Sequence, residues 1–229
     1  MRMRRKRNLD ARLAACESHI LCRLYAETAT PADNIRVLGG GVRRVLELGC
    51  GKGAFASCYA ARNADTEVYA VEKDMNVLVS VLETISLQNL RFIAGDALYL
   101  PRLFGDGTVD TVYLNFSTPF PKAPAQRLTH ERYLAVYRAL LKPGGTVELK
   151  TDNDDFFDYS AESLSAGGFE IISMTRDLHR GRVCADNSYD SNDETRGYNC
   201  RYGGNIITEY ERKFMSAGIT IKQLRAVLL

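Results

Sequence analysis

The stretch Val45-Leu46-Glu47-Leu48-Gly49-Cys50-Gly51-Lys52-Gly53-Ala54-Phe55 decides the fold of this chain. Its first four residues form the short, mainly apolar run that is typical of a buried strand. Glycines then stand at alternate positions. Glycine readily adopts the positive φ angles of a tight turn and lets a ligand approach the backbone closely. Residues 54–61 have the composition of a helix start. A strand, a glycine turn and a helix in this order open a nucleotide site in an α/β sheet.

Two kinds of cofactor fit this stretch. Gly49, Gly51 and Ala54 match the dinucleotide fingerprint G-x-G-x-x-G/A. Glu47 and the third glycine, Gly53, extend the pattern to E-x-G-x-G-x-G, which resembles the first motif of class I methyltransferases. Those enzymes bind S-adenosylmethionine (SAM), which carries an ammonium and a sulfonium and no phosphate. Carboxylates near such a ligand are electrostatically favourable.

Strand and helix signals alternate through the rest of the chain. We expect strands at residues 45–48, 67–71, 90–94, 109–116, 146–150, 169–174 and 219–228, and helices at 9–27, 55–62, 74–85, 129–141 and 152–164, with a short helix that begins at a capping box at 208–211. Strands separated by helices favour a parallel sheet. The expected fold is α/β, a Rossmann-like class I methyltransferase with a mostly parallel seven-stranded sheet and helices on both faces.

The length of 229 residues favours a single domain. We expect a basic N-terminal arm and helix over residues 1–41 and a SAM-dependent methyltransferase domain over 42–229. Residues 180–204 are rich in Gly, Asn, Asp, Ser and Arg and show no period, which predicts a mobile loop.

The basic residues crowd the start of the chain, although the net charge is only +2. The cations are Arg2, Arg4, Arg5, Lys6, Arg7 and Arg12, set against the single acid Asp10. Such an arm suits a polyanion, and a solvated, frayed terminus is the alternative. If the arm binds RNA, its deletion is expected to weaken RNA binding and to leave SAM affinity unchanged.

No secretory or membrane segment is expected, because charged residues interrupt the N-terminal region and no apolar run approaches the roughly 20 residues of a spanning helix. We therefore expect a cytoplasmic protein. Cys16, His19 and Cys22 would spread around a helix, so no metal site is expected. The sequence leaves open whether the protein is a monomer or a homodimer.

Polar residues end several of the expected strands, where open α/β sheets bind their ligands. These residues are Glu47, Glu72, Asp96, Asn115 and Asp152. Glu72 lies about 20 residues after the glycine turn, the spacing of an acid that binds ribose hydroxyls. Asp96 stands where a side chain can meet an adenine amino group. Taken alone, each acid is more typical of a helix cap or a surface charge. Three acids in register with the glycine turn favour a binding site instead.

The loop after residue 115 carries aromatic and basic residues between two prolines. The prolines stiffen the loop. Phe116 and Phe120 can stack on a base, as in proteins that bind unpaired nucleotides, and Lys122 can contact a phosphate or a base. A proline-bounded turn with core aromatics is the alternative.

Over nearly its whole length the chain resembles the bacterial tRNA (guanine-N7-)-methyltransferases. The resemblance rests on the basic start and on residues 47–53, 95–97, 113–117, 150–153, 177–179 and 208–211. It implies methyl transfer from SAM to N7 of a guanosine in the tRNA variable loop. The cofactor-binding residues would be Glu47, Gly49, Gly51, Gly53, Glu72, Asp96 and Asn115, and the substrate-binding residues Lys122, Asp152, Thr208, Glu209, Tyr210 and Glu211.

The chain departs from the family pattern at the presumed catalytic aspartate. The family pattern Asn-Phe-Ser-Asp-Pro-Trp-Pro-Lys is here Asn-Phe-Ser-Thr-Pro-Phe-Pro-Lys, so Thr118 occupies the aspartate position. Guanine N7 has an in-plane lone pair and needs no general base, so the reaction does not require an aspartate at this position to remove a proton. The catalytic candidates are Thr118, at the aspartate position, and Asp152. The alternatives are a SAM- or RNA-binding relative with weak or lost transferase activity, and a nicotinamide-dependent oxidoreductase, which would leave residues 115–122 and 208–211 unexplained.

Overall fold

The computed structural model describes residues 5–31, 35–37, 39–180 and 205–229. Its elements are α1 (Leu9–Ala15), η1 (Glu17–His19), β1 (Ile20–Leu24), β2 (Arg43–Leu48), α2 (Ala54–Arg62), β3 (Thr66–Glu72), α3 (Met75–Leu82), β4 (Leu90–Gly95), η3 (Ala97–Arg102), β5 (Val109–Asn115), η4 (Pro124–Gln126), α4 (Glu131–Leu140), β6 (Leu141–Thr151), α5 (Asp154–Ala166), β7 (Phe169–Thr175), α6 (Glu209–Ser216) and β8 (Lys222–Leu228). Apart from Arg180, the mobile loop predicted at 180–204 lies outside the described residues.

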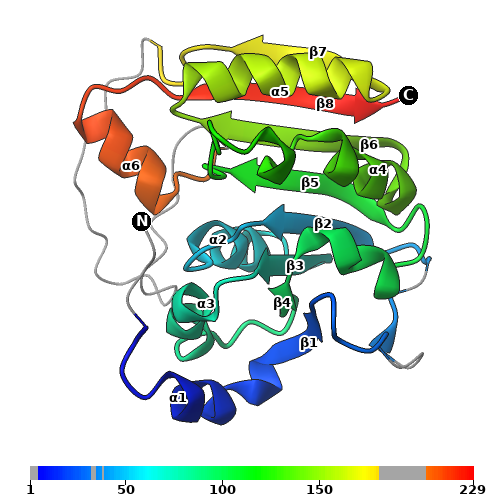
Figure 1. Cartoon of the computed structure of the whole chain (residues 1–229), viewed down its shortest axis with the longest axis vertical. Coiled ribbons are helices and arrows are strands. Elements are labelled where there is room, and N and C mark those ends of the chain that lie inside the picture. The colour runs from blue at the N-terminus through cyan, green and yellow to red at the C-terminus, as the bar shows by residue number, and fades with distance from the viewer. Residues whose placement is uncertain (1–4, 32–34, 38, 181–204) are drawn as a thin grey trace.

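The strands form one sheet in the order β1-β4-β3-β2-β5-β6-β8-β7 (Figure 1). The pairs from β1 to β6 are parallel, and β8 runs antiparallel between β6 and β7. The strand order reverses between β2 and β5, which is the point where open α/β sheets bind ligands. This arrangement confirms the predicted fold class.

The sheet of the described residues has eight strands where seven were predicted, because β1 joins its edge. The prediction of a helix over 9–27 was wrong beyond Ala15, since Ile20–Leu24 is extended and pairs with β4. Ile20 and Leu24 are four residues apart, a spacing that also fits a helix. Their actual partner is distant in sequence: the N–H of Asp96 donates to the carbonyl of Leu24 at 2.9 Å.

Two apolar clusters cover the two faces of the sheet, because side chains alternate along each strand. In β2, Val45 packs with α2 and α3 on one face. Leu46 and Leu48 pack with α4 and α5 on the other. Helices therefore lie on both faces, and the described helices include none long and apolar enough to cross a membrane.

The carboxyl ends of the parallel strands meet at one edge of the sheet, where α6 also lies (Figure 1). Gly49–Gly53 leave β2 at this edge and turn into α2. The topology thus brings residues from distant parts of the chain to one place, and this place holds the cavity described next.

Candidate cofactor and substrate site

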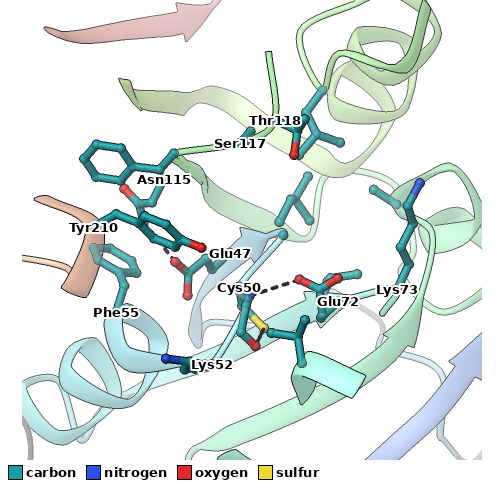
Figure 2. A pocket seen from close by; sticks show the side chains of 18 of the residues that line it. Glu47, Cys50, Lys52, Phe55, Glu72, Lys73, Asn115, Ser117, Thr118 and Tyr210 are labelled. Atoms are coloured by element: carbon teal, nitrogen blue, oxygen red, sulfur yellow. Dashed lines mark hydrogen bonds between the residues drawn. The ribbon is translucent and has the colours of Figure 1, made fainter. Parts of the chain in front are cut away.

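A cavity of about 470 Å³ opens at the carboxyl ends of the parallel strands. Its walls come from the glycine turn, the ends of β3, β4 and β5, the loop after β5 and the start of α6, as Figure 2 shows for several of these side chains. Its volume falls in the range of roughly 300–1,000 Å³ that is usual for small-molecule sites.

The glycine turn has the backbone that the sequence predicts. The backbone φ angles of Gly49, Gly51 and Gly53 are 72°, 58° and 70°. Residues that carry a Cβ rarely adopt such values. Gly49 and Gly51 line the cavity. Gly53 does not line it; instead it precedes α2, and a Cβ there would lie 2.9 Å from Cγ2 of Val81. Gly53 is therefore required for packing.

Glu47 is a buried carboxylate in the cavity wall, with only 3% of its surface exposed. Its Oε2 accepts a hydrogen bond from the N–H of Ala56 at 3.0 Å, and its Oε1 accepts one from Nδ2 of Asn115 at 3.1 Å. Burial raises the pKa of Glu47 to about 7, although both hydrogen bonds oppose the shift. A positively charged ligand in the cavity would favour the ionised form.

Glu72 and Asp96 also line the cavity, and both hold backbone in place. The carboxylate of Glu72 accepts from the N–H of Gly51 at 3.0 Å and from that of Asp74 at 2.9 Å. Asp96 caps η3 by accepting from the N–H of Leu98 at 3.1 Å. A carboxylate has about four lone-pair positions, so each acid still has acceptor capacity for a ligand.

An aromatic group lies beside the cavity where α6 meets the loop after β5. Phe116 has a ring centroid 6.2 Å from that of Tyr210 and 5.7 Å from that of Phe214, with tilts of 28° and 31°. Tyr210 is 58% exposed, and Thr118 is exposed at the same cavity (Figure 2). The cavity therefore has near-parallel rings and an uncharged hydroxyl in its outer wall.

The predicted substrate residues divide into two groups. Thr208, Glu209 and Tyr210 line the cavity. Lys122 is exposed and does not line the cavity, and Asp152 does not line it either. The carbonyl of Asp152 accepts from Nζ of Lys222 at 2.9 Å.

Glu211 does not line the cavity either, because it is fully buried behind it. Its carboxylate lies 3.1 Å from Nζ of Lys150 and 2.8 Å from Nε2 of His179. It also accepts from Nδ2 of Asn205 at 2.7 Å. Three of the motifs that carry the family resemblance thus meet at one buried carboxylate.

Sequence reasoning missed several residues of the cavity wall, among them Lys6 and Tyr133. The backbone N–H of Lys6 donates to Oδ1 of Asn76 at 3.0 Å, and its ammonium donates to the hydroxyl of Ser80. The basic character of the arm predicts a polyanion partner, and no local pattern points to a contact with α3. Ser117, at the same wall, was part of the loop motif, and its buried hydroxyl has no hydrogen-bond partner among the described residues.

The reversal of strand order at β2 and β5, the glycine turn and the acids at the carboxyl ends of β2, β3 and β4 define the class of protein: a class I methyltransferase fold. Solved structures agree with this class. The 16S rRNA methyltransferase KamB matches with a TM-score of 0.56 at 16% identity, over 90% of this chain and 98% of that one. A SAM-dependent methyltransferase from Aquifex aeolicus matches with a TM-score of 0.54 at 13% identity, over 82% and 85%.

Sequence comparisons identify the family. A family model described as "Putative methyltransferase" matches residues 43–224. The tRNA (guanine-N(7)-)-methyltransferase of Staphylococcus carnosus is 38% identical over 79% of each chain. That of Geobacillus thermodenitrificans is 36% identical over 80% of this chain and 78% of its own. The chain belongs to the tRNA (guanine-N7-)-methyltransferase family.

Among the described residues, no cluster of three or more His, Cys, Asp or Glu side chains could hold a metal ion.

Proposed function

We propose that this protein transfers a methyl group from SAM to N7 of a guanosine in the variable loop of tRNA, in the cytoplasm. The observation that carries the proposal is the acid-lined cavity beside the glycine turn, with Glu47 buried in its wall. Relatives with the matching name support the substrate.

The residues of the cavity fit SAM by charge and by shape. Glu47 is a buried acid whose ionised form gains from a cation, and SAM is cationic. Glu72 would accept from the ribose hydroxyls and Asp96 from the adenine amino group, while Gly49 and Gly51 let the ligand approach the backbone. Asn115 would act through Glu47, to which it donates. When bound, SAM supplies a methyl group on a sulfonium that a lone pair can take directly.

Guanine N7 already presents its lone pair, so no proton must be removed before it attacks the methyl group. The task left to the protein is to orient the base and to exclude water. Holding the reacting atoms at near-attack geometry accounts for much of the rate in such a reaction. Phe116 and Tyr210 are placed to stack on an unpaired base. Thr118 offers one hydrogen bond without charge at the same cavity.

Two observations favour a second candidate, a SAM- or RNA-binding protein with weak or no transferase activity. Thr118 stands at the aspartate position of the family pattern, and Lys122 lies outside the cavity wall. Such a protein would bind SAM and tRNA without turnover. A nicotinamide enzyme would instead bind NAD at the glycine turn.

Binding and transfer experiments separate these candidates. Calorimetry with SAM and with NAD is expected to show binding of SAM alone. Incubation with methyl-labelled SAM and unmodified tRNA is then expected to place label in the RNA. Binding of both SAM and tRNA without transfer of label would favour the second candidate, and binding of NAD would contradict the cofactor assignment.

A further inference from the structure

A buried polar cluster lies directly behind the first turn of α6. We call it the Glu211 cluster, and it consists of Lys150, His179, Asn205 and Glu211. The Glu211 side chain is 0% exposed and that of Lys150 is 6% exposed. Their ammonium and carboxylate lie 3.1 Å apart. Burial of such an ion pair costs desolvation energy, so the pair by itself is weak evidence of a contribution to stability.

The hydrogen bonds of the Glu211 carboxylate leave no room for a further ligand. Its Oε1 lies 2.8 Å from Nε2 of His179 and accepts from Nδ2 of Asn205 at 2.7 Å. Its Oε2 accepts from Nζ of Lys150 at 3.1 Å and from the N–H of Thr208 at 3.4 Å. These contacts occupy the roughly four lone-pair positions of a carboxylate. A substrate could reach Glu211 only by breaking the cluster.

The cluster instead fixes the start of α6. Thr208 and Glu211 form a capping box, in which the Thr208 hydroxyl accepts from the N–H of Glu211 at 3.0 Å. Neighbouring residues on a helix point in directions about 100° apart, so burial of Glu211 turns Glu209 and Tyr210 toward the outside. Both line the cavity, and both Glu209 oxygens accept from Nζ of Lys52 in the glycine turn, at 2.9 and 3.0 Å.

We propose that Glu211 is a positioning residue that holds α6 so that Tyr210 forms, with Phe116, a stacking platform for the target base. Glu211 itself does not touch the base. This inference rests on the proposed function for the identity of the base. It departs from the substrate contact that the family resemblance implies for Glu211.

The chain contains no tryptophan, so Tyr210→Trp creates a single fluorescent reporter on the platform. We would introduce Glu211→Gln into this background, which removes the charge and keeps the shape. Glu162→Gln is the matched control, because it makes the same change at an exposed acid on α5 outside the cavity wall. The double variant Lys150→Met/Glu211→Leu replaces the buried pair by apolar side chains and avoids an uncompensated charge. Far-UV circular dichroism identifies the folded variants.

In RNA-free protein, Glu211→Gln and the double variant are expected to shift the emission of the reporter, whereas Glu162→Gln leaves it unchanged. In steady-state assays, Glu211→Gln is expected to lower kcat/KM for tRNA at least tenfold and to change the Kd for SAM less than twofold. Loss of tRNA turnover with unchanged emission would overturn the proposal in favour of direct contact. A folded double variant with normal emission would overturn it as well.

The emission measurement in RNA-free protein does not depend on methyl transfer. An inactive wild-type protein would therefore contradict the proposed function without deciding the role of Glu211.

Discussion

At the scale of single residues, the predicted acids include three that line the cavity with acceptor capacity left and one, Glu211, that lies outside its wall. Glu47, Glu72 and Asp96 were predicted from their places at strand ends, and all three line the cavity. The family resemblance implies a substrate contact for Glu211, which instead is fully buried and does not line the cavity. A motif gives the position of a residue in the chain, whereas the direction of its side chain depends on contacts such as that with Lys150, which is distant in sequence.

Thr118 tests whether the chemistry needs a charge at the outer wall of the cavity. Because guanine N7 carries its own lone pair, Thr118→Asp is expected to change kcat for methyl transfer by less than about tenfold. Loss of one essential electrostatic group costs roughly 10²–10³ in rate. A gain approaching a thousandfold in single-turnover assays with saturating SAM would show that the wild-type protein lacks an essential aspartate.

Glu47 makes stability depend on pH in a direction that follows from its burial. Its pKa rises from an ordinary 4.5 to about 7, so between these values the folded protein binds more protons than the unfolded chain. The stability that protonated Glu47 confers is therefore present below pH 4.5 and is lost as the pH rises through 7. Glu47→Gln is expected to gain on the order of 2–3 kcal/mol relative to wild type between pH 4.5 and 8.

Urea unfolding of both ligand-free proteins at several pH values measures this difference. The Gln side chain can keep both hydrogen bonds if the Asn115 amide turns over, so the comparison isolates the charge. A difference between the two proteins that stays constant with pH would contradict the raised pKa.

At the scale of elements, the sequence was sufficient for every strand of the sheet except β1. The seven other strands and their order in the chain follow from apolar runs and turn residues. The exception is instructive, because Ile20 and Leu24 fit a helix by spacing and become a strand through a tertiary contact. A Cβ on Gly95 would lie 2.0 Å from the carbonyl oxygen of Leu24. Only glycine lets β1 approach so closely.

Gly95→Ala is therefore expected to push β1 away from β4. We expect a loss of about 1–3 kcal/mol in the free energy of unfolding, the usual cost of overpacking. The matched control is Gly41→Ala, since a Cβ there meets nothing within 4 Å, and its effect is expected to stay within about 0.5 kcal/mol. Equal effects of the two substitutions in urea unfolding would contradict this account of β1.

At the scale of the whole molecule, the basic N-terminal arm is tied to the body of the protein. Lys6 lines the cavity and bonds to α3. Arg12 donates to both oxygens of Glu83, at 2.6 and 2.7 Å, and Arg5 pairs with Asp10. The composition of the arm predicts RNA binding but not these contacts, which join residues far apart in the sequence. The arm therefore also contributes to the cavity wall, through Lys6.

Removal of residues 1–7 is expected to weaken tRNA binding and to make it less sensitive to salt, because fewer phosphates are neutralised. Lys6 lines the cavity and bonds to Asn76 and Ser80 of α3, so its removal opens that part of the wall. SAM affinity is expected to fall severalfold through the lost packing contacts, which revises the expectation from sequence. Lys6→Gln separates the two effects. Filter binding at two salt concentrations and calorimetry with SAM give the result, and unchanged SAM affinity in both variants would contradict the role of Lys6.

Methyl transfer to guanine N7 is tested most directly by mapping the methyl group after reaction of the protein with SAM and unmodified tRNA. We expect N7-methylguanosine at a guanosine of the variable loop, and a loss of product in Glu72→Ala, which removes the carboxylate that holds the glycine turn. Methylation at another atom or outside the variable loop, or product formation that Glu72→Ala leaves undiminished, would contradict it.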